Sequence, residues 1–216
     1  MSNIGERIKR YEKVYDYKLT PRSCLFVRVD GKSFHTFTKN CNKPFDQQII
    51  NAMVEAALHT AKQMPGFKLA YIQSDECTFM LTDFDNIQTQ GWFNYELNKV
   101  VSISAAYYTA YFNKFYGSKD AVFDSRAFIV PQDDAPNVFI WRQQDWERNS
   151  VQMLAQSQFN QRELQGKKIP EIHEMLLTKN LDWSKLSPQL KNGTFITQDF
   201  QFIYDKLHYD NIKEII

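Results

Sequence analysis

Two apolar segments that each meet an acidic residue constrain the fold of this chain more than any other feature. Segment 25–29 is rich in Val and Phe and stops at Asp30-Gly31, which predicts a buried strand that ends in a carboxylate and a turn. Downstream, two short apolar runs flank the sequence Ser-Asp-Glu at 74–76, which predicts a hairpin with acids at its tip. If the two strands are neighbours, Asp30 and Asp75 stand side by side.

Two close carboxylates predict a cation between them, because both cannot stay ionised at low cost without one. Magnesium suits such a pair, since it is a hard ion that completes its shell with waters and substrate phosphates. We therefore expect a two-metal site for phosphoryl transfer at Asp30 and Asp75. The alternative for each motif alone is a plain turn, because Asp-Gly and Ser-Asp-Glu are both common turn sequences.

The composition is that of a folded chain with no marked charge. A length of 216 residues predicts one large domain, or one domain with an appendage, and an aromatic fraction of 15% argues against disorder. The net charge of +1 gives no sign of a nucleic-acid partner, although it does not exclude a local basic groove. Three cysteines without CxxC spacing predict a reducing compartment and no structural zinc. The start of the chain is no signal peptide and no run reaches membrane-spanning length, so we expect a cytoplasmic protein with no membrane partner.

The order of the predicted elements is strand, helix, strand, strand, helix, strand, after a first helix over 3–16. This order predicts a ferredoxin-like α+β fold, a palm with a four-stranded antiparallel sheet and both helices on one face. We expect the first strand to lie beside the strand that follows the first helix of this unit. The strands are predicted at 24–29, 68–73, 77–82 and 121–130, the helices at 46–64 with Asp46 as N-cap and at 91–116, and a long polar loop at 31–45.

Beyond the palm pattern the composition changes. Residues 134–160 have helical periodicity, a short helix is expected at 171–178, residues 181–191 are irregular, and 193–196 predict a last strand. We therefore divide the chain into a palm-like core, 1–132, and a C-terminal helical and β appendage, 133–216, packed on it. Nucleotide cyclases and polymerase palms share this plan, so the fold alone does not choose among functions.

Several short motifs follow one another along the chain in a fixed order. They are Arg28 to His35 with Phe37 and Lys39, Lys43 to Asp46, Ser74 to Glu76, Phe123 to Arg126, Trp141 to Asp145 and Lys191 to Thr194. The ordered set covers roughly residues 5–196 and resembles the tRNA-His guanylyltransferase family, polymerases that add nucleotides to the 5′ end of tRNA in the 3′-to-5′ direction.

This resemblance implies a nucleotidyltransferase with two magnesium ions, held by Asp30, the backbone carbonyl of Gly31, and Asp75. It implies GTP and ATP as substrates, tRNA as partner, an appendage that faces the tRNA, and a homotetramer built as a dimer of dimers. The chemistry agrees, since backbone amides of a turn after a strand suit phosphate oxygens and nearby lysines add positive charge. The implied triphosphate contacts are Asp30, Gly31, Lys32, Ser33, Phe34, His35, Lys43, Asp46, Ser74 and Asp75.

Some of these residues have a structural alternative. Asp30, Asp75 and Glu76 are the catalytic candidates, but Glu76 is also a good structural acid, and this is the interpretation we favour slightly. His35 is better explained as a neighbour of the nucleotide than as a general base. The alternative for Lys32, Lys39 and Lys43 is an ordinary solvated loop face, and for Lys39 the two interpretations stand equal. Two arginines, Arg126 and Arg142, each have two alternative roles. Each either binds phosphate or pairs with a nearby acid, which is Asp124 for Arg126 and Asp145 for Arg142.

One segment departs from the family pattern. Where members specific for tRNA-His carry His-Ile-Asn-Asn-Leu-Tyr-Asn, this chain has residues 147–153, Glu-Arg-Asn-Ser-Val-Gln-Met. That resembles the branch that repairs 5′-truncated tRNA by template-dependent addition. The alternatives are a tRNA-His guanylyltransferase that adds the extra guanosine, a nucleotide cyclase on the same palm, and a non-catalytic nucleotide or RNA-binding protein.

Overall fold

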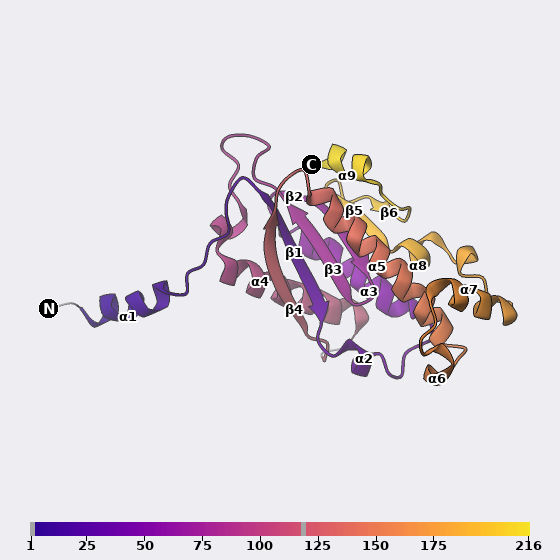
Figure 1. Cartoon of the computed structure of the whole chain (residues 1–216). Coiled ribbons are helices and arrows are strands. Elements are labelled where there is room, and N and C mark those ends of the chain that lie inside the picture. The colour runs from indigo at the N-terminus through magenta and orange to yellow at the C-terminus, as the bar shows by residue number, and fades with distance from the viewer. Residues whose placement is uncertain (1–2, 118–119) are drawn as a thin grey trace.

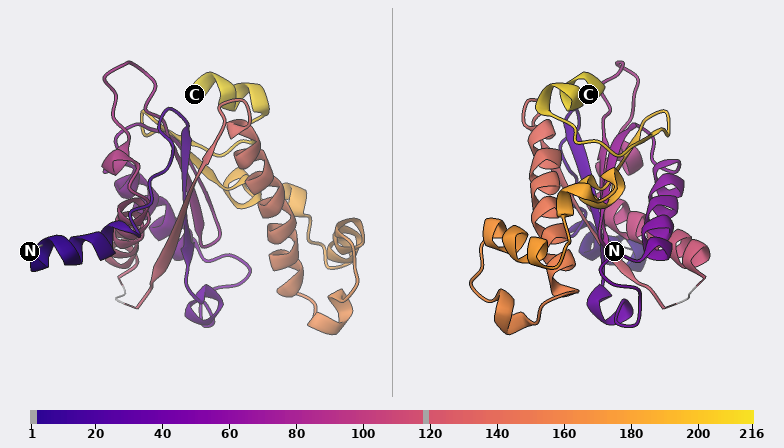
Figure 2. Two further views of the ribbon diagram at one scale, coloured as in Figure 1. Left: turned by 60° about the vertical axis from the view of Figure 1, so that its left-hand side comes forward. Right: turned by 90° about the vertical axis from the view of Figure 1, so that its right-hand side faces the viewer.

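A computed structural model, which describes residues 3–117 and 120–216, contains a six-stranded antiparallel sheet between two helical layers (Figures 1 and 2). The strand order is β4-β1-β3-β2-β5-β6, and its first four strands have the predicted ferredoxin-like arrangement. The fold is therefore α+β, as the element order predicted. The strands are β1 Cys24–Gly31, β2 Phe67–Gln73, β3 Glu76–Leu81, β4 Phe123–Val130, β5 Thr194–Thr197 and β6 Phe202–Ile203.

One predicted neighbour relation is wrong. The strand beside β1 is β3, the second arm of the hairpin, and β2 lies one position further out. The crossover from β1 to β2 leaves a gap one strand wide, and the chain fills it by turning straight back through the hairpin. The hairpin tip still reaches the end of β1, because Asp30 pairs with Glu76 and the amide of Gly31 donates to the carbonyl of Asp75 at 3.0 Å.

Two helices cover one face of the sheet, α3 Gln47–Ala61 and α4 Leu97–Tyr116. Between them and the strands lies an apolar core that includes Val27, Val29 and Tyr108. Asp46 caps α3 as predicted, since its carboxylate accepts from the amides at the start of the helix. The preceding loop contains a helical turn that the sequence did not predict, α2 Phe34–Phe37.

The second long helix starts later than predicted. Residues Trp92–Tyr95 form a separate 3-10 turn, η1, in which Phe93 and Asn94 have φ values of 48° and 49°. The reason is tertiary: the carbonyl of Tyr95 accepts from Leu19, and the amide of Leu97 donates to Tyr17. These bonds to the N-terminal segment hold the backbone out of the helix until Leu97.

The other face of the sheet is covered by α5 Ala135–Gln156 (Figure 2). Phe139 of α5 packs on Phe26, Met80 and Phe195 in a second apolar core. The C-terminal segment also extends the sheet, because β5 pairs with β2. Residues 181–191, which were expected to be irregular, contain short helices. The remaining elements are α6 Gln161–Leu164, α7 Ile169–Thr178, η2 Trp183–Lys185, α8 Pro188–Asn192 and α9 Tyr209–Ile215.

The first helix, α1 Ile4–Lys13, projects away from the body (Figure 1). It has no buried residue, and Ile4, Ile8 and Tyr11 are exposed along it. Within residues 3–117 and 120–216, no helix has the length and apolar character that crossing a membrane requires.

Candidate active site

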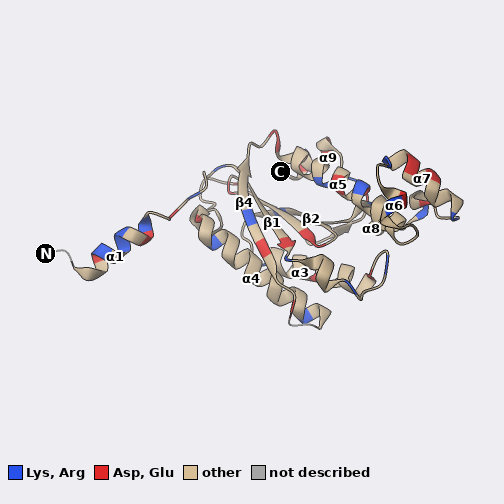
Figure 3. Cartoon of the chain, turned by 60° about the horizontal axis from the view of Figure 1, so that its bottom comes forward, with Lys and Arg blue, Asp and Glu red and all other residues tan. Residues whose placement is uncertain are grey.

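The acid of the first motif, Asp30, lies at the end of β1, on the face of the sheet that α5 covers. Side chains alternate along a strand, so Val29 enters the core under α3 and α4 while Arg28 and Asp30 face the other way. In the strand register Asp30 lies opposite Glu76 on β3 and opposite Asp124 on β4. Figure 3 shows acidic and basic residues on the neighbouring strands β1 and β4 at this place. The register therefore aligns acidic residues of three adjacent strands at this end of the sheet.

The surroundings of Asp30 work against its ionised form. Burial contributes most to raising the pKa of Asp30, and the negative charges of Asp75 and Asp124 raise it further, against the opposing effect of Arg126 and Arg28. A divalent cation would relieve this cost. Because the hydroxyl of Ser74 donates to Asp75 at 2.9 Å, that carboxylate is held in place at the tip of the hairpin.

The donors at this place fit magnesium. They are carboxylate and carbonyl oxygens, which hard cations prefer. Elsewhere in the part of the chain that the structure describes, as here, no three His, Cys, Asp or Glu side chains converge into a metal cage. A site with only two protein carboxylates leaves most of the ion's shell to water and phosphate oxygens, which is how magnesium is usually bound.

Tight backbone geometry shapes the turn after β1. A Cβ atom on Gly31 would lie 2.3 Å from the ring of Phe34, so only glycine fits there. Ser33 follows with a φ of 53°, and Ser74 at the hairpin tip has a φ of 50°. Positive φ values at non-glycine residues are uncommon and concentrate at functional sites.

The loop from α2 to α3 is held by Asp46. Burial opposes ionisation of this carboxyl, but the amides of Asn42, Ile49 and Gln48 outweigh it and lower the pKa of Asp46. Its role in the structure is thus to fix the loop that carries Lys43, whose ammonium donates to the carbonyl of Thr38 at 3.2 Å.

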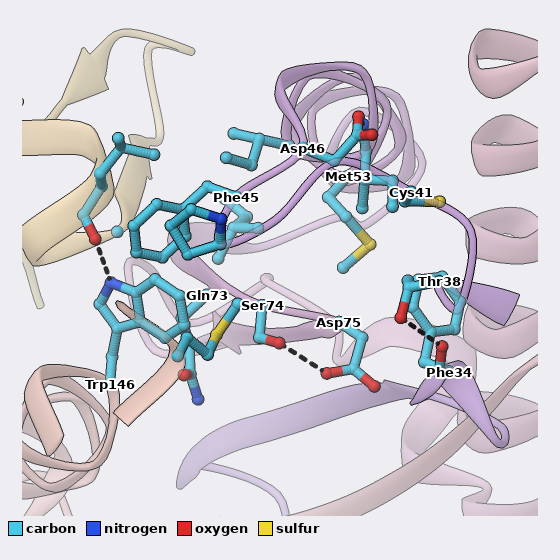
Figure 4. Close-up of a pocket in the computed structure, with 18 of the residues that line it drawn as sticks. Phe34, Thr38, Cys41, Phe45, Asp46, Met53, Gln73, Ser74, Asp75 and Trp146 are labelled. Atoms are coloured by element: carbon cyan, nitrogen blue, oxygen red, sulfur yellow. Dashed lines mark hydrogen bonds between the residues drawn. The ribbon is translucent and has the colours of Figure 1, made fainter. Parts of the chain in front are cut away.

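A cavity of about 430 Å³ lies between this loop, the hairpin tip, α5 and α8 (Figure 4). That volume is within the range of small-molecule pockets. Asp30, Lys32 and Glu76 are not part of its lining; Lys32 is exposed, with its amide bonded to the carbonyl of Val122 at 2.8 Å. The predicted triphosphate contacts that do line it are Gly31, Ser33, Phe34, His35, Lys43, Asp46, Ser74 and Asp75.

Two aromatic residues at the far end of the cavity were not predicted from the sequence. Phe45 and Trp146 face one another there with ring centroids 6.3 Å apart, and the indole of Trp146 donates to the carbonyl of Leu190 at 3.2 Å. Met53 and Met153 also line the cavity. Phe45 stands inside a quoted motif and Trp146 directly follows one, but nothing in their local spacing shows that their rings meet.

Glu76 is buried in an ion-pair network between β3 and α5. Its carboxylate lies 2.7 Å from Nε of Arg142 and 3.7 Å from Nε of Arg28. Burial raises the pKa of Glu76, and the two arginines counteract it. Arg142 also pairs with Asp145 at 2.8 Å, so its guanidinium lies between two protein acids.

The remaining candidates lie on the surface. Arg126 pairs with Asp124 at 3.2 Å, which is the acid pairing considered for it, and Lys39 is exposed. His35 is exposed too, with Nε2 3.1 Å from the hydroxyl of Thr36. Glu147, in the segment 147–153 that departs from the family pattern, is paired with Lys206 and does not line the cavity.

Paired carboxylates at the end of a palm-like sheet, beside a cavity of nucleotide size, are the arrangement of a nucleotidyltransferase. A family model described as tRNAHis guanylyltransferase matches residues 5–131, which is more than half of the chain. The chain belongs to this family, and it is an enzyme of the nucleotidyltransferase class.

Solved structures and curated relatives agree with this assignment. A bacterial tRNA(His) guanylyltransferase (Thg1)-like protein in complex with ATP is 39% identical, with 99% of each chain covered and a TM-score of 0.95. Such a bacterial protein in complex with GTP is 36% identical, over 100% of this chain and 97% of the other, with a TM-score of 0.86. A probable tRNA(His) guanylyltransferase of Dictyostelium discoideum is 27% identical over 87% of this chain and 81% of its own length.

Proposed function

We propose that this protein is a magnesium-dependent nucleotidyltransferase that adds nucleotides to the 5′ end of tRNA in the 3′-to-5′ direction, and that it repairs 5′-truncated tRNA under the direction of a template. The observation that supports this most is the cavity, where Gly31 and Asp75 meet beside Asp30. Similar proteins have been solved in complex with ATP and with GTP, and we propose both as substrates here.

The two ends of the cavity suit the two halves of a nucleoside triphosphate. Phe45 and Trp146 give the far end flat apolar walls, which suit a base. The near end has the hydroxyls of Ser33 and Ser74 and the ammonium of Lys43, which suit phosphate oxygens. In this orientation the reacting phosphate lies by the hairpin tip.

Magnesium would be held by Asp30, Asp75 and the carbonyl of Gly31, and when bound it would neutralise the charge that develops on the phosphates. The protein's own part is positioning. The turn of Gly31 to Ser33 brings backbone groups to the phosphates, and Lys43 supplies a fixed positive charge. The RNA end enters as an adenylylated 5′-monophosphate or as a 5′-triphosphate. The 3′-hydroxyl of the incoming nucleotide loses its proton and attacks the RNA 5′ α-phosphate, and AMP or pyrophosphate, respectively, leaves.

Template dependence is supported by Glu147. In the resembling pattern this position is a histidine, which can carry positive charge near neutral pH. Glutamate cannot supply that positive charge, and here Glu147 is paired with Lys206 and does not line the cavity. Without a contact that selects an unpaired guanosine, selection falls on base pairing with the opposite strand.

The test is a set of 5′-truncated tRNAs that differ only in the template base, each offered the four triphosphates with magnesium. We expect addition of the nucleotide that completes each Watson–Crick pair, no addition in EDTA, and poorer use of intact tRNA-His. Guanosine added regardless of the template base, with intact tRNA-His preferred, would instead make the protein a tRNA-His guanylyltransferase.

We propose a homotetramer, a dimer of dimers, in the cytoplasm, where the free cysteines stay reduced. The support is α1: a ten-residue helix alone is marginal in water, yet its apolar stripe of Ile4, Ile8 and Tyr11 is uncovered. Light scattering should give four copies, and Ile8→Glu should lower that number while Lys13→Glu, on the opposite side of α1 by helical spacing, leaves it unchanged. A monomeric wild type would refute this assembly.

Within each copy we propose that residues 1–132 form the catalytic core and that residues 133–216 face the tRNA. The C-terminal segment supplies α5, which walls one side of the cavity through Trp146 and Met153. It also pairs its strand β5 with β2 of the core. Both contacts support an appendage packed firmly on the core.

A further inference from the structure

Trp141 is an aromatic side chain that neither core uses. It lies on α5 and is 51% exposed. Its ring nevertheless has two cations at its face: the guanidinium carbon of Arg142 is 4.4 Å from the ring centroid, and that of Arg28 is 5.6 Å away. Half of the indole is thus engaged by the protein, and the rest is open to solvent.

The position of the indole is fixed by the arginines that it contacts. The side chain of Arg142 is only 7% exposed and is held by Glu76 at 2.7 Å and by Asp145 at 2.8 Å. Arg28 reaches the same Glu76 carboxylate. Because the guanidinium that lies over the ring is itself paired with acids from two elements, Trp141 is presented as a preorganised flat surface.

This surface lies close to the paired carboxylates but outside the cavity. Arg28 precedes Asp30 by two residues on the same face of β1, a distance of about 7 Å along a strand. Trp141 is not part of the cavity lining, so a nucleotide in the cavity leaves it free. Arg126 lies opposite Arg28 on β4 and is half-exposed, so it places a further cation on the strand next to Arg28.

We propose that Trp141 is the stacking platform for the base at the 5′ end of the RNA, the end that receives the new nucleotide, with Arg126 beside it for the backbone phosphate. This inference rests on the proposed function. Every base has a π-face, so stacking on an aromatic ring holds a strand without reading its sequence. A template-directed enzyme needs a contact of that kind, since the end that it extends differs from one RNA to the next.

The test compares two substitutions that differ in one property. Trp141→Phe keeps an aromatic face, whereas Trp141→Leu keeps an apolar cover over Arg142 but loses the face. Phe202→Leu is the matched control, because Phe202 is also a surface aromatic, 40% exposed, and lies on the edge strand β6 at the opposite side of the sheet from β4. Affinity is measured for an acceptor-stem hairpin that lacks its first 5′ nucleotide and, separately, for ATP with magnesium.

We expect Trp141→Leu to weaken RNA binding about 5- to 150-fold, the range of one lost base–aromatic stack, while ATP affinity and melting temperature stay unchanged. Trp141→Phe should stay within about threefold of wild type, and Phe202→Leu should equal it. Equal RNA affinity in the Leu and Phe variants would overturn the platform. The platform would also be overturned if Trp141→Leu weakened binding of ATP alone, or if the Leu and Phe variants both failed to fold.

Two further readouts separate stacking from charge. Binding of the hairpin should quench tryptophan emission in the wild type and much less in Trp141→Phe. Arg126→Gln should lower the slope of log affinity against log salt by about one, and Trp141→Leu should leave that slope unchanged. If wild-type protein neither binds nor extends the hairpin, the proposed function fails; if it does both and Trp141→Leu behaves as wild type, only the platform fails.

Discussion

The two faces of the central sheet carry different chemistry on the same strands. Toward α3 and α4 the strands present mainly apolar groups to the core, such as Val27 and Val29 of β1, and the polar Ser125 of β4 is hydrogen-bonded to Ser104 of α4. Toward α5 the face is divided, with Phe26 in an apolar half and Arg28 and Asp30 in a charged half near the hairpin tip.

This difference shows how one strand serves stability and chemistry together. Neighbouring residues of β1 point to opposite faces. A carboxylate that the site needs therefore does not have to be buried in the core under α3 and α4, and the stability of that core is unaffected. Helix α5 covers this charged half, and its Arg142 forms an ion pair with the buried Glu76. We therefore expect substitutions on the two faces to separate activity from stability.

The largest effect should come from the paired carboxylates. Asp30→Ala or Asp75→Ala should lower nucleotide addition by roughly a thousandfold or more, because metal-assisted charge stabilisation is worth several kcal/mol. The fold should survive, since the change removes like-charge repulsion. Val29→Ala is the control: it should destabilise the protein and leave the rate of addition near wild type when folded. Full activity in either Asp variant would remove the two-metal interpretation.

The next effect concerns the stability of the charged half. Glu76→Ala removes one of the two acids that pair with the buried Arg142 and leaves only Asp145, which should lower the free energy of unfolding by about 3–5 kcal/mol. A second substitution, Arg142→Met, made in the same chain should recover most of that loss, because the buried guanidinium that lost Glu76 is gone. Denaturant titration of the two single variants and the double variant measures this. If the double variant is as unstable as the sum of the singles, the ion pair is not what joins β3 to α5.

A smaller effect is expected from Lys43. A charged hydrogen bond contributes about 1.5–3 kcal/mol, so Lys43→Ala should weaken triphosphate binding by about 10- to 150-fold. Lys39→Ala, in the same loop but outside the cavity lining, is the matched control and should change little. Nucleotide titration with magnesium checks both. Equal affinity in the two variants would assign Lys43 to the solvated loop face.

The smallest effect is a pH dependence of stability at Asp30. Its pKa is raised in the folded protein, by burial first and then by Asp75 and Asp124, so folding disfavours the ionised carboxyl. That penalty is absent below the unfolded pKa and develops as the pH rises through the folded pKa. In EDTA at neutral pH, Asp30→Asn should therefore melt higher than wild type, and the difference should vanish in acid. Parallel melting curves across the pH range would contradict this.

Much of the site could be predicted because its parts are local. Asp30 ends an apolar run, Asp46 precedes a helical pattern, and the tip of the hairpin is a turn sequence, so each signal lies within a few residues. Phe45 and Trp146 escaped prediction because the wall that they form joins a loop to α5. The pairing of Glu76 with Arg142 was also missed, since the acid considered for Arg142 was only its near neighbour Asp145.

The sequence by itself determined the element order, the ferredoxin-like α+β plan and the meeting of Asp30 with the hairpin tip. Strand periodicity and turn chemistry act over short separations, and few sheet topologies satisfy that order. The tertiary structure alone decided that β3 and not β2 lies beside β1, that α4 begins only at Leu97, and which charges Glu76 meets. These outcomes depend on contacts between segments far apart in the chain, which local spacing does not encode.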